Sequence, residues 1–221
     1  MQFAITLLTL ALSVFSKPSG APKCIINEVN IEKGMGTKSD PALGYSIDAV
    51  PGQGNTYSFT VKNTAGRADF QGVLMYVTSG TDAKAHFGKF TLPTGGALDG
   101  KFKFHPACAG TSTGPLEATV THANPKRIPL NTPTTFTWTG TAEDIAKGNL
   151  QFNAVIASLD PTQTGKAKWQ KIQPIPLVFN GQGGAVVPGG QQGGQQQGGQ
   201  VPGLNKVIKC LPRGMIRGHS L

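Results

Sequence analysis

The feature that most constrains the fold is a succession of short apolar segments separated by turn residues. In residues 56–62 (TYSFTVK), Tyr57, Phe59 and Val61 alternate with polar residues, the pattern of a strand with one buried face. Residues 73–77 (VLMYV) are continuously apolar, which favours a central strand. Further strand-like segments follow, separated by Gly, Pro, Asn or Asp, at residues 86–92, 101–104, 116–122, 134–138, 150–157 and 175–179. About eight short strands in roughly 160 residues predict an all-β fold, an antiparallel sandwich of two sheets.

Helical signals are sparse, in line with 30 Gly and 16 Pro among the 221 residues. Only residues 141–148 (TAEDIAKG) have a helical pattern, in which Thr141 can cap the N-terminus and two acidic residues occupy the first turn. We expect one or two turns of helix there. Residues 17–24 (KPSGAPKC) predict an extended arm, and the segment from there to about Gly54 has weak periodicity and many turn residues.

The first sixteen residues, MQFAITLLTLALSVFS, are typical of a secretory signal peptide. Their apolar run is too short to span a bilayer, and the small residues Val14 and Ser16 predict cleavage after Ser16. A buried core helix is the alternative, but the turn-rich KPSGAP follows at once. No Lys or Arg precedes the apolar run, which departs from the usual signal pattern. With no later membrane segment and no glycolipid-anchor tail, we expect a secreted, extracellular protein.

The C-terminal part changes in composition. Residues 181–203 are rich in Gly and Gln and nearly uncharged, which predicts a flexible linker, or else a self-associating tract. Residues 204–221 form a basic tail, either solubilising or in contact with anions through Lys206, Lys209, Arg213 and Arg217. The expected organisation is a signal peptide at 1–16, a sandwich domain at 17–180, the linker at 181–203 and the tail at 204–221.

The net charge of +9 points to anionic partners. Residues 17–180 hold 16 basic and 11 acidic residues, a net +5, and the tail supplies the remaining +4. We expect acidic glycans or anionic cell-surface polymers, including microbial envelopes, as partners, and no nucleic acid. The alternative is that the excess Lys only aids solubility.

Three cysteines, Cys24, Cys108 and Cys210, allow one disulfide and leave one thiol over. Because Cys24 and Cys108 both lie in the patterned region, we expect them to pair. A bridge that closes so long a loop stabilises a fold by about 4–5 kcal/mol on the chain-entropy model. Cys210 is then free or joins two chains as a dimer.

The sequence contains none of the common catalytic motifs. G-x-S-x-G, H-E-x-x-H, C-x-x-C and a phosphate-binding loop are all missing, and the aspartates are scattered. We therefore expect that the protein is not an enzyme and that it has no catalytic residue, no cofactor and no metal. The alternative is a copper or zinc site formed if the fold brings His86, His105 and His122 together. A copper oxygenase site built on an N-terminal histidine is not expected, because the predicted mature N-terminus is Lys17.

Several motifs, in their order and spacing, resemble the Reeler (reelin) domain family. They are PSGAPKC at 18–24, DFQGVLMYV at 69–77, FGKF at 87–90, Cys108, ATVTH at 118–122, TTFTW at 134–138, LQFNAVIA at 150–157 and Trp169. The resemblance covers residues 17–179. It implies an antiparallel sandwich with Cys24 bridged to Cys108, while a second disulfide of some members has no counterpart here. It also implies an extracellular, non-enzymatic binding role, as in matrix, neuronal and invertebrate defence proteins.

The loop after residues 118–122 holds the candidate ligand-binding residues of the domain. Thr121 and His122 match the family pattern at a strand end, so we interpret His122 as a frame residue that hydrogen-bonds backbone in the following turn. Lys126 and Arg127 are loop residues and candidates for anion contact, or are simply solvated. Trp138 alternates with Phe136 and is expected in the core.

Three functions follow from these observations. The leading one is a secreted, non-enzymatic module that binds glycans or anionic surfaces, including microbial ones, in defence or matrix adhesion. The second is a structural matrix or wall protein, cross-linked through Cys210 and organised by the Gly/Gln-rich tail. The third is a metal-dependent enzyme that uses the three histidines.

Overall fold

The structure is a computed structural model that describes residues 20–110, 114–124, 126–159, 167–180 and 184–186. The chain divides into two units, Met1–Pro188 and Gly189–Leu221, and all the described residues belong to the first. The expected signal peptide, Cys210 and the basic residues of the tail lie outside the described residues. Within the described ranges, neither helix has the length and apolarity that a membrane span requires.

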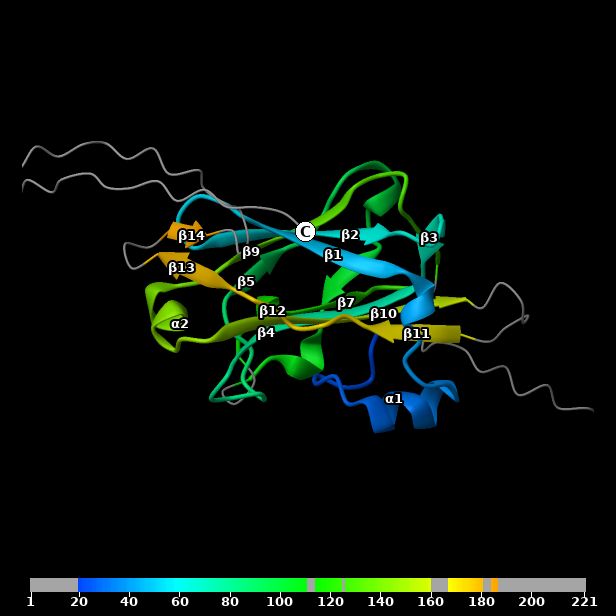
Figure 1. Ribbon diagram of the computed structural model, residues 1–221, viewed down its shortest axis with the longest axis horizontal. Coiled ribbons are helices and arrows are strands. Elements are labelled where there is room, and N and C mark those ends of the chain that lie inside the picture. Colours follow the sequence, from blue (N-terminus) through cyan, green and yellow to red (C-terminus); the bar gives the residue numbers. More distant parts are fainter. Residues whose placement is uncertain (1–19, 111–113, 125, 160–166, 181–183, 187–221) are drawn as a thin grey trace, which may run out of the picture. The chain divides into compact units, whose positions relative to one another are not determined.

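Two antiparallel sheets pack face to face (Figure 1), which confirms the predicted all-β sandwich. The four-stranded sheet has the order β1 (Tyr45–Pro51), β2 (Thr56–Asn63), β9 (Thr134–Thr139), β5 (Lys89–Thr91). The six-stranded sheet has the order β11 (Ala167–Lys171), β10 (Leu150–Leu159), β4 (Gly72–Ser79), β7 (Thr119–His122), β6 (Phe102–Phe104), and β12 (Ile175–Pro176) pairs with β10. Two small ribbons join β3 (Asp69–Phe70) to β8 (Ile128–Pro129) and β13 (Val178–Asn180) to β14 (Gly184–Val186).

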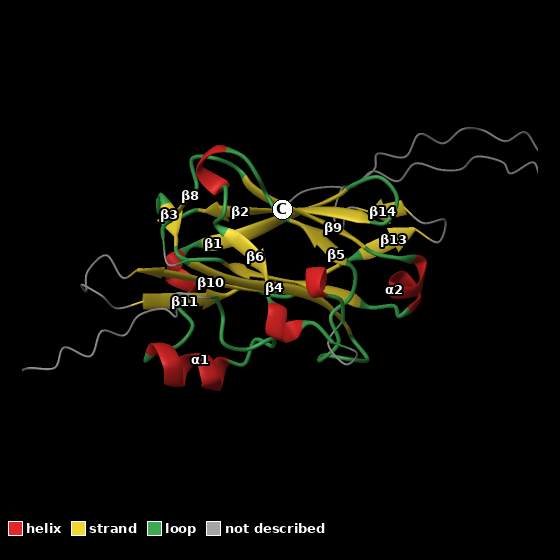
Figure 2. Ribbon diagram, turned by 180° about the vertical axis from the view of Figure 1, so that it is seen from behind, coloured by secondary structure: helices red, strands yellow, loops and turns green. Residues whose placement is uncertain are grey.

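The helices are short and lie outside the two sheets (Figure 2). The α-helices are α1 (Glu28–Met35) and α2 (Ala142–Ala146). The 3-10 turns are η1 (Pro41–Leu43), η2 (Gly96–Leu98), η3 (Pro106–Cys108) and η4 (Leu116–Ala118).

The core forms because each sheet turns one apolar face to the other. In β2, the alternating Tyr57, Phe59 and Val61 are buried as predicted. The rings of Phe59 and Phe152, from opposite sheets, stack with centroids 3.9 Å apart. All eight residues of β4 are buried, because it is central in its sheet and because the N-terminal segment covers its outer face.

Trp138 lies in this core, as predicted, and is fully buried. Its indole Nε1 donates to the carbonyl of Phe87 at 2.8 Å. Gly88, the next residue, has a φ of 68°, and a Cβ built on it would lie 2.4 Å from the indole ring. Only glycine therefore lets this loop pass so close to the tryptophan.

The expected helix at residues 141–148 is confirmed by α2. Thr141 and Asp144 form a capping box there. The expectation that no other segment is helical is wrong, because α1 forms between its cap Asn27 and Gly36, which has a φ of 71°. No residue of α1 is buried, so the helix lacks the apolar stripe that makes helices recognisable in a sequence.

The strands β1 and β11 were also missing from the expectations, as was the two-residue strand β8. β1 is an edge strand of the four-stranded sheet, and β11 is an edge strand of the six-stranded sheet. In addition, Gly184–Val186 pair with β13 as β14, so the ordered structure continues into the segment expected to be a linker.

Candidate functional site

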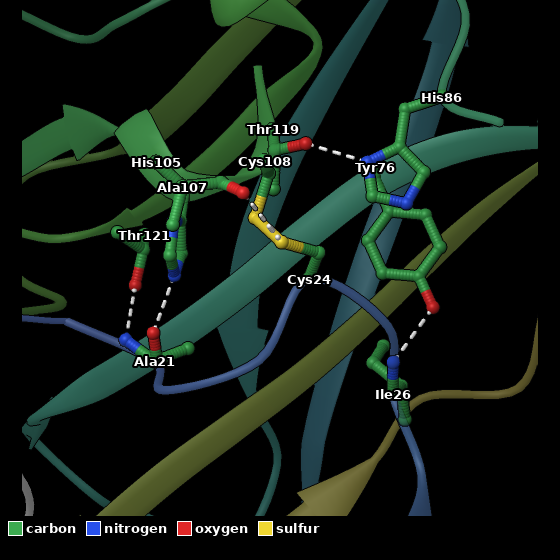
Figure 3. Close-up of a disulfide and its surroundings, with 10 residues drawn as sticks. All are labelled: Ala21, Cys24, Ile26, Tyr76, His86, His105, Ala107, Cys108, Thr119 and Thr121. Atoms are coloured by element: carbon green, nitrogen blue, oxygen red, sulfur yellow. Dashed lines mark hydrogen bonds between the residues drawn. A yellow bond between two sulfur atoms is a disulfide. The ribbon is translucent and has the colours of Figure 1, made fainter. Parts of the chain in front are cut away.

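The N-terminal segment is fastened to the outer face of the six-stranded sheet (Figure 3). Cys24 and Cys108 form a disulfide with their Cα atoms 5.3 Å apart, which confirms the predicted pairing. On either side of it, the backbone nitrogen of Ala21 donates to Thr121 Oγ1 at 2.8 Å, and that of Ile26 donates to Tyr76 Oη at 2.9 Å. The arm is therefore an ordered part of the domain.

His86 and His105 lie near this disulfide, and both are buried. His86 stacks on Tyr76 with ring centroids 4.1 Å apart, and its Nδ1 lies 2.6 Å from Thr119 Oγ1. His105 Nε2 donates to the carbonyl of Ala21. Burial lowers the pKa of His86 to about 4; the nearby carboxylate of Asp82 opposes this shift, and His105 adds a smaller lowering. Both imidazoles fit the packed frame of the domain.

The histidine metal set that was the alternative to a metal-free protein, His86, His105 and His122, is not assembled. Within the described ranges, the group of three potential ligands found close together is Cys24, His105 and Cys108, and its two cysteines are joined in the disulfide. His86 and His122 are not members of that group. The geometry gives no support to the metal-dependent alternative.

His122 contacts backbone, as expected, but not in its own turn. Its Nδ1 accepts from the backbone nitrogen of Val73 in β4 at 3.3 Å. The residue is buried at the end of β7. His122 therefore links the neighbouring interior strands β4 and β7, which agrees with a role in the frame.

A basic cleft of about 890 Å³ lies beside the β3–β8 ribbon. Four separate segments line it: the end of β2, the turn into β3, the η2 region and the loop around β8. The lining residues are Val61, Lys62, Asn63, Arg67, Ala68, Asp69, Ala97, Lys101, Arg127, Pro129, Leu130 and Asn131. Figure 2 shows β3 and β8 paired at one end of the sandwich.

The charges of the cleft are predominantly positive. Four basic side chains line it, Lys62, Arg67, Lys101 and Arg127, against the single carboxylate of Asp69, a net +3. Arg127 Nη1 lies 3.1 Å from Asp69 Oδ2, and Lys62 pairs with Asp48 on β1. Because the arginine and lysine of these pairs are more than half exposed, both remain accessible to a ligand.

The other two cations are positioned by backbone carbonyls. Arg67 donates to the carbonyl of Leu159 at 3.2 Å, which directs its guanidinium towards the end of β10. Lys101 Nζ donates to the carbonyl of Arg127 at 2.8 Å and so joins the η2 region to the β8 loop. Different elements therefore hold the four cations around the same cleft.

The structure separates the two candidate loop residues, Lys126 and Arg127. Arg127 lines the cleft, whereas Lys126 is exposed and is not among the lining residues. Sequence reasoning missed Lys62, Arg67 and Lys101. Lys62 and Arg67 lie five residues apart, but Lys101 and Arg127 come from other segments and the four share no local motif, so the fold is what brings them together.

No protein-family model and no curated protein matches the chain. Similar solved structures include two fragments of the human F-spondin reeler domain. They are 16% identical, with TM-scores of 0.38 and 0.37, and each match covers 59% of this chain and 93% or 89% of that chain. The Reelin-N domain of F-spondin is 16% identical with a TM-score of 0.41, over 66% of this chain and 97% of that chain. These are reeler domains, the family that the sequence motifs resemble.

Proposed function

We propose that this chain is a secreted, non-enzymatic binding module that recognises acidic glycans or similar anionic polymers of cell surfaces through the basic cleft. The observation that carries the proposal is the convergence of four basic side chains against one carboxylate. Microbial envelopes and extracellular matrix both carry such polymers, so defence and adhesion are the settings that fit.

Acidic ligands are favoured over neutral ones by the composition of the cleft. Among the described residues that line it, none carries an aromatic ring on which a sugar face stacks. Apart from the Asp69 carboxylate, the polar side-chain groups are guanidinium, ammonium and amide; the guanidinium and ammonium groups bind sulfate and carboxylate oxygens by charge-assisted hydrogen bonds. Its volume of about 890 Å³ falls within the range of about 300–1,000 Å³ typical of ligand sites.

The basic tail adds a second contact in this proposal. Lys206, Lys209, Arg213 and Arg217 lie in the sequence after the domain, and a linked second site raises the overall affinity for a polymer without a new contact on the domain. The tail alone gives attraction that depends strongly on salt.

The proposal is tested by binding of the purified chain to a panel of sulfated, carboxylated and neutral oligosaccharides at low and at high salt. A second chain ends after Val186, which keeps the β13–β14 pair and removes the tail. We expect both chains to prefer acidic over neutral oligosaccharides, and the longer chain to bind polymers more tightly.

Two outcomes oppose the proposal. Binding that disappears with the tail makes the protein a generic basic anchor and leaves the cleft without a role. Binding to none of the panel favours the structural alternative, in which covalent dimers through Cys210 on a non-reducing gel are expected.

A further inference from the structure

A second pocket, of about 240 Å³, lies between the N-terminal segment and the outer face of the six-stranded sheet. Its floor is formed by Gly72 and Leu74 of β4, Val155 and Ala157 of β10, and Trp169 of β11. Its roof is formed by the arm and by Ile31 and Met35 of α1. Figure 1 shows α1 over this face of the sheet.

The roof is held at both ends but packs loosely between them. At the arm end, the roof is held by the Cys24–Cys108 disulfide and by the hydrogen bond from the Ala21 backbone nitrogen to Thr121 Oγ1. At the far end, Trp169 Nε1 donates to the carbonyl of Thr37 at 2.8 Å, and Glu28 pairs with Lys171 at 2.8 Å. No residue of α1 is fully buried, and its apolar side chains Ile31 and Met35 are half-buried and line the pocket beneath.

The lining of the pocket crosses four adjacent strands, from His122 on β7 to Trp169 on β11, which at a strand spacing of about 4.8 Å is a span of about 14 Å. Spread over that length, the volume of about 240 Å³ corresponds to a mean cross-section of about 17 Å², which suits one extended alkyl chain. A compact ring of the size that an apolar cavity of about 150 Å³ holds would leave much of that length empty.

The lining also suggests the chemistry of one end of the ligand. It consists mainly of apolar side chains, with Lys23 as its one permanently charged residue and no acidic residue among the described ones. Lys23 is exposed and belongs to the arm, so it stands at the mouth of the pocket rather than in its depth. An anionic head group at the mouth contacts the Lys23 ammonium, while the alkyl chain of the ligand packs against the apolar lining.

We propose that this pocket beneath α1 binds a medium-chain fatty acid, with its alkyl chain across β4, β10 and β11 and its carboxylate at Lys23. The site is separate from the basic cleft and shares no lining residue with it. The proposed fatty-acid site therefore does not depend on whether the basic cleft binds glycans.

The first test is titration of the purified chain with hexanoate and octanoate by calorimetry and by tryptophan emission. The chain has two tryptophans, and one of them, Trp169, lines the pocket. We expect saturable binding of one fatty acid per chain, a change in the emission, and an affinity that rises about fourfold per methylene. No binding, or an affinity independent of chain length, overturns the proposal.

Filled pockets provide the second test. Ala157→Leu fills the space from the sheet and Ile31→Phe fills it from α1, while Ala146→Leu makes a matched change on exposed α2. Each variant is checked by its unfolding temperature. We expect the two filling variants to weaken octanoate binding by about tenfold or more, because the ligand must compete with a packed side chain. Octanoate affinity equal to that of the Ala146→Leu variant in both overturns the proposal.

The position of the carboxylate is tested by a charge pair. Lys23→Gln removes the cation at the mouth, and Lys33→Gln removes an exposed cation of α1 that does not line the pocket. We expect Lys23→Gln to weaken octanoate by about two- to fivefold, and to leave octanol unaffected, because the contact is exposed to water. Equal losses in the two variants would contradict the orientation of the ligand.

Discussion

Asp69 is the carboxylate that lines the basic cleft, and it is paired with Arg127 through Oδ2 and Nη1 at 3.1 Å. Removing its charge with Asp69→Asn changes the net charge of the lining from +3 to +4. We expect affinity for a sulfated oligosaccharide to rise by about two- to fivefold, since the arginine no longer has a competing partner. Calorimetric titration at fixed salt measures the change.

The control for this substitution is Glu143→Gln on α2, which makes the same charge change at an exposed position away from the cleft. We expect it to leave the affinity nearly unchanged. An equal gain in both variants would mean that only the total charge of the protein matters.

His86 links stability to pH. Because burial lowers its pKa to about 4 in the folded chain, from about 6.5 when exposed, the unfolded chain binds more protons between these values. The contribution of His86 to the free energy of unfolding is therefore fully present above about pH 6.5. It is lost as the pH falls towards 4, by up to about 3 kcal/mol.

Denaturant unfolding of the wild-type chain and of a His86→Phe variant between pH 7 and 4.5 tests this linkage. Phenylalanine keeps a ring against Tyr76 but does not titrate. The variant is expected to lose less stability over that range than the wild type. Parallel pH dependences would show that His86 titrates normally in the folded chain.

In the loop before β5, the packing of Trp138 requires glycine at position 88. Gly88→Ala places a methyl group where the indole of Trp138 lies at 2.4 Å, whereas Gly54→Ala adds one at a similar φ of 62° with no atom within 4 Å. Both variants suffer the cost of positive φ. We expect Gly88→Ala to be less stable than Gly54→Ala by about 1–3 kcal/mol in chemical unfolding. Equal stabilities would mean that the loop moves away freely.

Elements were predictable where their own residues bury a face. The alternation in β2 and the apolar run in β4 follow directly from burial on one or on both faces, and the capping box at Thr141 specifies α2 locally. α1 buries no residue, so only its caps Asn27 and Gly36 mark it. β11 is short, and Trp169 is covered by the N-terminal segment around Thr37, a contact that the sequence near β11 does not indicate.

The candidate sites depend on the whole molecule. Lys62, Arg67, Lys101 and Arg127 come together because β2, β3 and β8 meet at one end of the sandwich, and no spacing in the sequence encodes that meeting. The sequence indicated a basic surface and one of these residues, Arg127. The pocket beneath α1 was not predictable, since it is the space that side chains leave empty.

In the proposed function, a particular cleft rather than the overall charge of the protein recognises acidic polymers. Lys126 and Arg127 are neighbours with the same charge, and both are exposed, but only Arg127 lines the cleft. The most direct test is therefore to compare the affinities of Arg127→Gln and Lys126→Gln for one sulfated oligosaccharide by calorimetry. We predict a loss of about tenfold for Arg127→Gln and less than about twofold for Lys126→Gln. Equal losses in the two variants would contradict the account.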